Sequence, residues 1–233
     1  MTLPTIVAHR GASKAERENT LEAFAAARRM GADMVELDVR RTADGALIVH
    51  HDALIDGVPI ITMRADELPD HVPGLEEALD ACAGMDVNVE IKSDRTEPDY
   101  DPDQRVAGQV VALLARRSDR DRMLVSSFDR ATINAVRSAE PLLRTGYLFM
   151  LPELLNGETI GSFAEGVAAE GHCAVHPHRR AATAELIAAA HAAGLAVNVW
   201  TVDRPDELRE LRDRGVDALI TNVPDIAREA LRG

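Results

Sequence analysis

Acidic and basic side chains alternate with apolar ones near the ends of two short segments. Glu36 and Asp38 lie two residues apart in "DMVELDV", and Glu90 and Lys92 lie two apart in "VNVEIK". Side chains alternate faces along a strand, so the members of each pair point the same way. Three carboxylates that converge in a low-dielectric site need protonation, a basic partner or a metal ion, and hard oxygen ligands favour Mg²⁺ or Ca²⁺ over zinc.

The alternative is an ion network without a metal. In that arrangement Arg10, Arg40 or Lys92 neutralises the two acids of the first segment. Residue spacing alone leaves both readings open.

Imidazoles and a guanidinium accompany the acids. His9 and Arg10 end the segment "TIVAH" and begin the turn that follows it, and His50 and His51 are adjacent in "LIVHHD". Arg suits phosphate, and a pair of histidines suits displacement at a phosphodiester, where one group takes a proton and another protonates the leaving oxygen. Alternation along the strand places His50 and His51 on opposite faces, and periodicity does not say which one faces inward.

The elements that must position these residues alternate regularly along the chain. Short apolar, β-branched runs are followed by longer Ala-, Leu- and Arg-rich stretches of helical period, the pattern of parallel strands covered by helices. Eight such units predict a (β/α)8 TIM barrel in one domain over 1–233, with a doubly wound open sheet as the alternative. The predicted strands are 5–9, 33–39, 86–92, 122–128, 144–149, 172–176, 195–202 and 217–221, and the clearest helices are 20–30, 75–83, 104–117, 130–138, 181–193, 204–214 and 224–231.

One excursion interrupts the alternation after the second strand. A turn signal "ADG", a short strand "ALIVHH" and an irregular stretch predict an insertion over about 43–73. In a barrel, the carboxyl ends of the strands form the active face, so the acidic pairs and this insertion should meet at the same mouth.

Composition sets limits on what the protein binds. The chain has 233 residues, 46% of them hydrophobic and only 3% aromatic, and a formal net charge of −13. This charge opposes nucleic acid and anionic lipid, so we expect neither nucleic-acid binding nor membrane association. The start "MTLPTIVAHRG" has no signal-peptide pattern and only Cys82 and Cys173 are present, so we expect a soluble cytoplasmic protein without disulfides.

The motifs in order are "AHRG", "ENTLEAF", "VELDVRRTADGALIVHHD", "VNVEIK", "VNVWTV" and "ALITNVP". Together they resemble the glycerophosphodiester phosphodiesterase family across essentially the whole chain. The resemblance implies a TIM barrel that hydrolyses glycerophosphodiesters to an alcohol and glycerol 3-phosphate with a divalent cation, Mg²⁺ or Ca²⁺.

The resemblance also implies roles for particular residues. Matched by motif, His9 and His51 become the catalytic acid/base pair, which makes His50 a bystander. Glu36, Asp38 and Glu90 become the metal ligands, Arg10 and Lys92 contact phosphate, and Trp200 lines the glycerol pocket. Which histidine is the acid, whether water or a substrate hydroxyl attacks, and the oligomeric state stay open.

Two departures from the family pattern affect these expectations. The insertion after "HHD" is short, and Asn222 replaces the aspartate of a "TDxP" ending, where we expect it to shape the last loop. The rival functions are a lysophospholipase D-like or other phosphodiesterase activity and a non-catalytic barrel that binds phosphorylated metabolites. The intact histidines and acids oppose the non-catalytic reading, because a binding module needs no pair of proton carriers.

Overall fold

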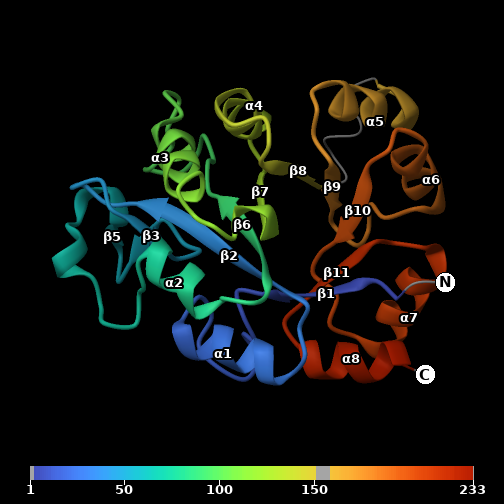
Figure 1. Ribbon diagram of the computed structural model, residues 1–233, viewed down its shortest axis with the longest axis horizontal. Coiled ribbons are helices and arrows are strands. Elements are labelled where there is room, and N and C mark those ends of the chain that lie inside the picture. Colours follow the sequence, from blue (N-terminus) through green and yellow to red (C-terminus); the bar gives the residue numbers. More distant parts are fainter. Residues whose placement is uncertain (1–2, 151–157, 233) are drawn as a thin grey trace.

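A closed barrel forms the centre of the computed structural model, which describes residues 3–150 and 158–232 (Figure 1). Eight parallel strands of the described chain close the barrel, because β1 pairs with β2 on one side and with β11 on the other. The predicted TIM barrel is therefore confirmed, and the open sheet is excluded. In spatial order the strands are β1 Thr5–His9, β11 Ala218–Thr221, β10 Ala196–Val199, β9 Ala174–Pro177, β8 Arg144–Phe149, β7 Met123–Ser127, β6 Asp86–Ile91 and β2 Met34–Arg41.

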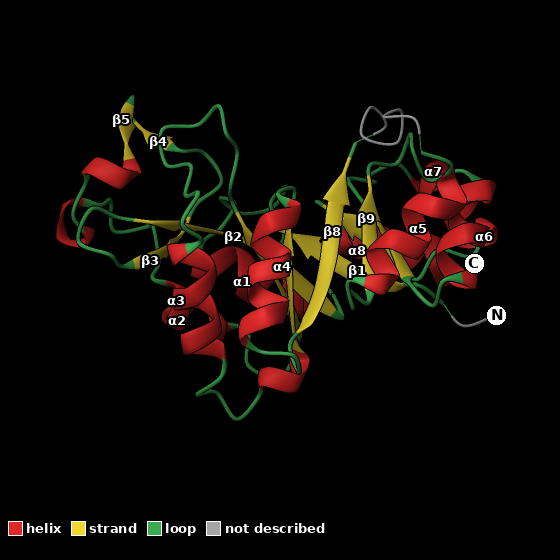
Figure 2. Ribbon diagram, turned by 90° about the horizontal axis from the view of Figure 1, so that it is seen from above, coloured by secondary structure: helices red, strands yellow, loops and turns green. Residues whose placement is uncertain are grey.

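Helices cover the outside of this barrel (Figures 1 and 2). Several begin at side-chain caps: the hydroxyl of Thr20 accepts from Ala23 N, and that of Thr183 accepts from Leu186 N. These caps satisfy amide groups that a helix start leaves unpaired. The helices are α1 Leu21–Arg29, α2 Leu75–Ala81, α3 Arg105–Leu114, α4 Arg130–Ala139, α5 Ile160–Ala169, α6 Ala184–Ala192, α7 Pro205–Arg214 and α8 Pro224–Arg232, with a 3₁₀ turn η3 at Arg120–Arg122.

Sequence prediction erred mainly at the strand ends and at one helix. The sixth strand was expected over 172–176, but β9 runs over Ala174–Pro177, because its ladder with β8 begins only at Ala174, while the His172 side chain contacts Thr145. Helix α5 was not among the clearest predictions, since its sequence "IGSFAEGVAA" carries two glycines that lower helix propensity. Packing of Phe163 and Val167 against the barrel stabilises this helix nevertheless.

The predicted insertion is confirmed at the carboxyl end of β2. Strand β3, Leu47–Val49, pairs antiparallel with the end of β2 and brings the chain back to the barrel mouth. A small cluster of Ile48, Ile55 and Ile60 holds the excursion together. The rest of it is the hairpin β4 Leu54–Ile55 and β5 Val58–Pro59, followed by the 3₁₀ turns η1 Ile60–Thr62 and η2 Ala65–Glu67.

Apolar packing fills the lower part of the barrel and leaves its mouth to polar groups. Val7, Met34, Leu124, Ala218 and Ile220 form a cluster inside the barrel. Larger clusters lie between the strands and the surrounding helices. Polar side chains further along β1, β2 and β6 therefore project above an apolar floor, at the carboxyl ends of the strands.

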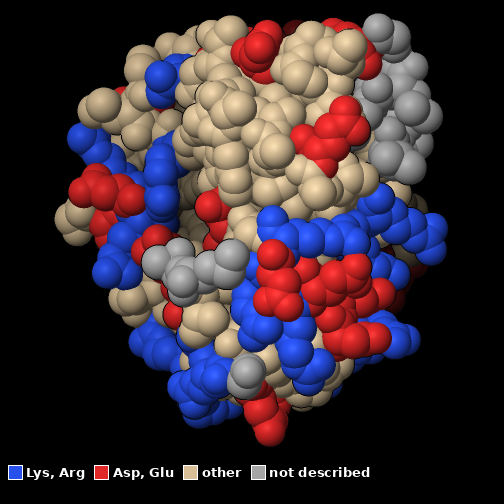
Figure 3. All heavy atoms as spheres, turned by 90° about the vertical axis from the view of Figure 1, so that its right-hand side faces the viewer, with Lys and Arg blue, Asp and Glu red and all other residues tan. Residues whose placement is uncertain are grey.

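The outer surface carries charges of both signs. On the face shown in Figure 3, basic and acidic side chains are interspersed. Some surface charges form pairs, such as Arg214 with Glu210 at 2.5 Å. Exposed pairs of this kind contribute little stability. Within the described residues, the helices are too short or too polar to cross a bilayer.

Candidate active site

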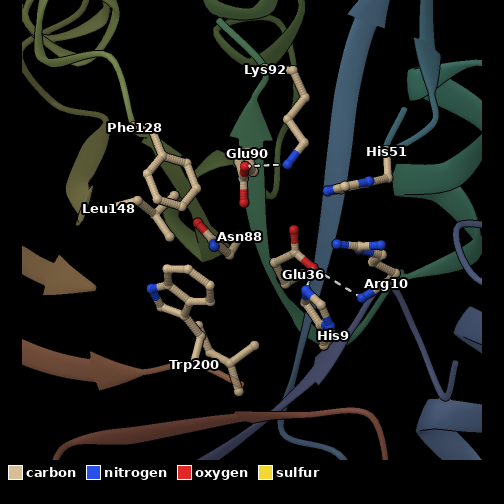
Figure 4. A pocket seen from close by; sticks show the side chains of 11 residues that line it. His9, Arg10, Glu36, His51, Asn88, Glu90, Lys92, Phe128, Leu148 and Trp200 are labelled. Carbon is tan, nitrogen blue, oxygen red and sulfur yellow. Dashed lines mark hydrogen bonds and ion pairs between the residues drawn. The ribbon is translucent and has the colours of Figure 1, made fainter. Parts of the chain in front are cut away.

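A cavity of about 240 Å³ opens at the carboxyl ends of the strands (Figure 4). It combines the ends of β1, β2 and β6 with those of β7, β8, β10 and β11, and His51 from the insertion closes one side. Seven of the residues predicted for the site lie together around it. The lining residues are His9, Arg10, Glu36, His51, Asn88, Glu90, Lys92, Phe128, Leu148, Trp200 and Ile220.

Three carboxylates converge on the charged side of this cavity. One oxygen each from Glu36, Asp38 and Glu90 lies within 4.8 Å of the other two. All three residues are buried, and β2 pairs with β6 in a register that sets Asp38 beside Glu90. This is the predicted cluster, and its hard oxygen donors fit a divalent cation such as Mg²⁺ or Ca²⁺.

Basic side chains neutralise two of the three acids. Arg10 Nε lies 3.2 Å from Asp38, and Lys92 Nζ lies 3.0 Å from Asp38 and 2.6 Å from Glu90. Glu36 is different: its Oε2 accepts from the backbone N–H of Arg10 at 2.9 Å, while its buried Oε1 has no hydrogen-bond partner among the described residues. The ion network is therefore present, yet it leaves one buried carboxylate oxygen for another ligand.

The acids respond to this environment in opposite directions. Burial, together with the charges of Asp38 and Glu90, raises the pKa of Glu36 well above its ordinary value. Burial also raises the pKa of Glu90. Burial works in the same direction on Asp38, but Lys92, Arg10 and His51 outweigh it and hold that pKa well below its usual range. Like charges in one buried site thus oppose the ionisation of Glu36 and Glu90, whereas the basic neighbours favour the ionisation of Asp38.

A tight turn after β1 places Arg10 over the acids. Arg10 and Asn19 both adopt left-handed backbone conformations, with φ of 57° and 58°, and Asn19 N–H donates to the carbonyl of Arg10. A side chain at Gly11 would lie 2.6 Å from the backbone of Ala23, so only glycine fits there. The buried amide of Asn19 donates to Asp38 at 2.8 Å, whereas Thr20 is the helix cap.

His9 is held by a residue from the opposite end of the chain. Its Nδ1 lies 2.7 Å from Oδ1 of Asn222, and its Nε2 lies 4.0 Å from Glu36. Burial, with a smaller contribution from the charge of Arg10, lowers the pKa of His9 to about 4. His9 is therefore a neutral imidazole at neutral pH in the absence of further ligands.

His51, and not His50, lines the cavity with the carboxylates. Its Nδ1 lies 2.7 Å from the carboxylate of Asp52, and the imidazole faces Glu36 and Arg10 in Figure 4. The buried guanidinium of Arg40 holds the carbonyl of His51 with bonds of 2.8 and 2.6 Å and pairs with Asp99 at 2.6 Å. Arg40, which was a candidate partner of the acids, instead fixes the insertion against the mouth.

The opposite wall of the cavity is apolar. Phe128 and Trp200 pack edge to face with ring centroids 5.4 Å apart, and Leu148 and Ile220 continue this wall. Trp200 follows the last residue of β10, and its indole N–H donates to the carbonyl of His176 at 2.8 Å. The indole is therefore fixed in orientation, with its face available to a ligand (Figure 4).

Several residues at this site escaped the sequence reasoning. Asn222 was assigned to loop shape, although it directly follows β11 at the mouth and touches His9. Asn88 lies two residues before Glu90, on the same face of β6, and its buried Oδ1 has no hydrogen-bond partner among the described residues. Phe128, the last residue of the predicted strand 122–128, was assigned no role. Strand parity gave a signal for Asn88, whereas the contact of Asn222 depends on barrel closure.

Known proteins resemble this chain in both sequence and fold. The sequence model described as the glycerophosphoryl diester phosphodiesterase family matches residues 9–226. A protein of Caldanaerobacter subterraneus subsp. tengcongensis called glycerophosphodiester phosphodiesterase is 27% identical, over 94% of this chain and 94% of its own. A Bacillus subtilis protein of the same name is 28% identical, over 97% and 86%. The crystal structure of a Thermotoga maritima glycerophosphodiester phosphodiesterase superposes with a TM-score of 0.82 at 27% identity, over 98% and 99%.

Proposed function

This chain belongs to the glycerophosphoryl diester phosphodiesterase family, and from this premise we propose that it cleaves glycerophosphodiesters with a divalent cation and two histidines. It is a phosphoric diester hydrolase of the glycerophosphodiester phosphodiesterase type. The proposed products are glycerol 3-phosphate and the alcohol of the headgroup.

The observation that carries the proposal is the charge balance of the buried cluster. Three ionised carboxylates with Arg10 and Lys92 have one net negative charge, and a bound divalent cation changes this to one net positive charge. A phosphodiester carries one negative charge, so the loaded site matches it.

Glu36, Asp38 and Glu90 are the residues that would hold the cation, since their oxygens converge and Oε1 of Glu36 lacks another partner. When bound, such an ion supplies Lewis-acid stabilisation of the charge that grows on the phosphoryl oxygens. Arg10 and Lys92, which already border these oxygens, add preorganised donors on the same side.

His9 and His51 are the proposed proton carriers, and both imidazoles line the cavity near Glu36 (Figure 4). One takes the proton of the attacking hydroxyl, and the other gives a proton to the departing alcohol oxygen. Both imidazoles are held through Nδ1, so each presents Nε2 to the cavity.

The apolar wall would take the glycerol carbons. The Trp200 face and Leu148 offer apolar contact on the side of the cavity away from the charges. A substrate lying across the cavity therefore has its phosphate on β1, β2 and β6 and its carbon chain on the opposite strands.

The direct test is the identity of the products. Glycerophosphocholine, glycerophosphoethanolamine and bis(p-nitrophenyl) phosphate are incubated separately with the purified protein, and products are separated chromatographically. We expect glycerol 3-phosphate with free choline or ethanolamine. Release of phosphocholine and glycerol, or cleavage of the nitrophenyl diester alone, would refute the proposal.

A further inference from the structure

A hydrogen-bonded chain of three residues runs from the last two strand ends to His9. Asp203, which follows β10, binds Asn222, which follows β11, and Asn222 in turn binds His9 at the end of β1. The links measure 2.7 Å each, and Thr221 and the backbone of Asn222 add two further bonds to the same Asp203 carboxylate. The proposed function assigns no role to Asp203 or Asn222.

The chemistry of Asp203 fixes the direction of every bond in this chain. A carboxylate only accepts hydrogen bonds, so the end of the Asn222 side chain that faces it must be the NH₂ group. The other end is then the carbonyl oxygen, which also accepts from the hydroxyl of Ser13 at 2.9 Å. Because that oxygen is an acceptor, Nδ1 of His9 must carry the proton.

The partner of the second histidine has a different charge. Nδ1 of His51 contacts the carboxylate of Asp52 at 2.7 Å, whereas Nδ1 of His9 contacts a neutral amide oxygen. A carboxylate stabilises a protonated imidazolium, and an amide does so much less. The two imidazoles therefore differ in the group that holds Nδ1, which is a carboxylate for His51 and an amide oxygen for His9.

We propose that Asp203 and Asn222 are positioning residues that hold His9 with its proton on Nδ1, so that its Nε2 is free to accept the proton of the attacking hydroxyl. This assignment rests on the proposed function. The attacking oxygen loses its proton to Nε2 of His9 and forms a bond to phosphorus. The bond from phosphorus to the headgroup oxygen breaks, and that oxygen takes the proton from Nε2 of His51.

The test reads the position of the proton directly. Nitrogen-15 NMR of the Mg²⁺-saturated protein near neutral pH distinguishes a protonated ring nitrogen from an unprotonated one, and eight histidines make assignment feasible. The His9 signals are identified by their loss in His9→Ala. We expect Nδ1 of His9 to be protonated and Nε2 unprotonated.

Variants then test the chain that sets this state. In Asp203→Asn the carboxylate anchor is gone, so the amide of Asn222 is free to reverse, and we expect a mixture of His9 tautomers. We also expect a 10- to 100-fold lower kcat, with KM within about 3-fold, as is usual when an orienting partner is lost. The exchange Asp203→Asn with Asn222→Asp restores one carboxylate and one amide, so it should recover the Nδ1–H tautomer and most of kcat.

The matched control is Asp206→Asn, three residues further along the chain in the first turn of α7. Asp206 pairs with Arg204 at 2.7 Å and is exposed, so this change should leave both tautomer and kcat as they are. A His9 proton on Nε2 in the unaltered protein would overturn the proposal, and this result needs no variant to fold. So would an Asp203→Asn protein with unchanged tautomer and kcat. The spectra require no turnover, so they stand apart from a failure to cleave glycerophosphodiesters.

Discussion

The two walls of the active-site cavity are built on different principles. The wall of β1, β2 and β6 buries three acids and two bases within a few ångströms, whereas the wall of β7, β8, β10 and β11 presents Phe128, Leu148, Trp200 and Ile220. Within one closed sheet, one group of neighbouring strands thus offers charged side chains to an anion, and the other group offers apolar side chains to the carbon atoms of a ligand. The barrel therefore supplies positions, and the residue types at its strand ends decide the chemistry.

Replacing Glu36 by Gln should break the charged wall most severely. The change keeps the shape of the side chain but removes the carboxylate whose Oε1 lacks a partner. Loss of a cation that contributes several kcal/mol to transition-state stabilisation predicts a fall in kcat/KM of about 10³-fold or more. Glu170→Gln, which alters an acid paired with Arg130 outside the barrel, is the matched control in the same assay.

His51→Ala should come next in size. Loss of one proton carrier predicts a fall in kcat of about 100-fold or more. Its neighbour provides the control, because His50 does not line the cavity with the acids, and His50→Ala should keep kcat. Equal losses in the two variants would mean that the insertion as a whole, rather than the His51 imidazole, matters.

His176 is a titratable residue on β9, between the strands β8 and β10 that contribute to the apolar wall. It is fully buried and contacts Asn198 at 2.9 Å. Burial lowers the pKa of His176 to about 3. Below about pH 6.5 this histidine is therefore protonated in the unfolded chain but not in the folded protein. The free energy of unfolding consequently falls as the pH drops from 6.5 toward 3. At pH 5 the loss from this residue should be about 2 kcal/mol relative to pH 7.

Urea unfolding at pH 7 and pH 5 measures this loss, and His176→Gln separates it from other groups. The variant should lose about 2 kcal/mol less than the unaltered protein over this interval. The same pH dependence in both proteins would show that His176 is protonated in the folded state.

Trp200→Ala should have the smallest effect on catalysis, and it should change only the apolar wall. Loss of one apolar face predicts a rise of about 10-fold in KM for glycerophosphocholine with little change in kcat. The inhibition constant of inorganic phosphate serves as the control, because phosphate uses only the charged wall. A parallel rise in that constant would show that the two walls do not act independently.

The sequence predicted the charged wall far better than the apolar one. Glu36, Asp38 and Glu90 stand out because charged residues two apart in an apolar strand have few structural explanations, and parity places them on one face. Phe128 and Leu148 do not stand out, since apolar residues at strand ends are ordinary core components.

Barrel closure explains what else escaped prediction. The contact of Asn222 with His9 joins residues 213 positions apart, and no local pattern encodes it. The bond of Arg40 to the carbonyl of His51 likewise depends on how the insertion folds back. By contrast, the eight-unit alternation predicted the barrel itself, because each strand and helix is specified locally.

The claim that Glu36, Asp38 and Glu90 hold a cation needed for catalysis is tested by the dependence of turnover on a divalent cation. Release of glycerol 3-phosphate from glycerophosphocholine is measured after removal of metal with a chelator and again after Mg²⁺ or Ca²⁺ is restored. The charged wall predicts a loss of at least about 100-fold in chelator and recovery with one of the two ions. Full activity in excess chelator would contradict the account.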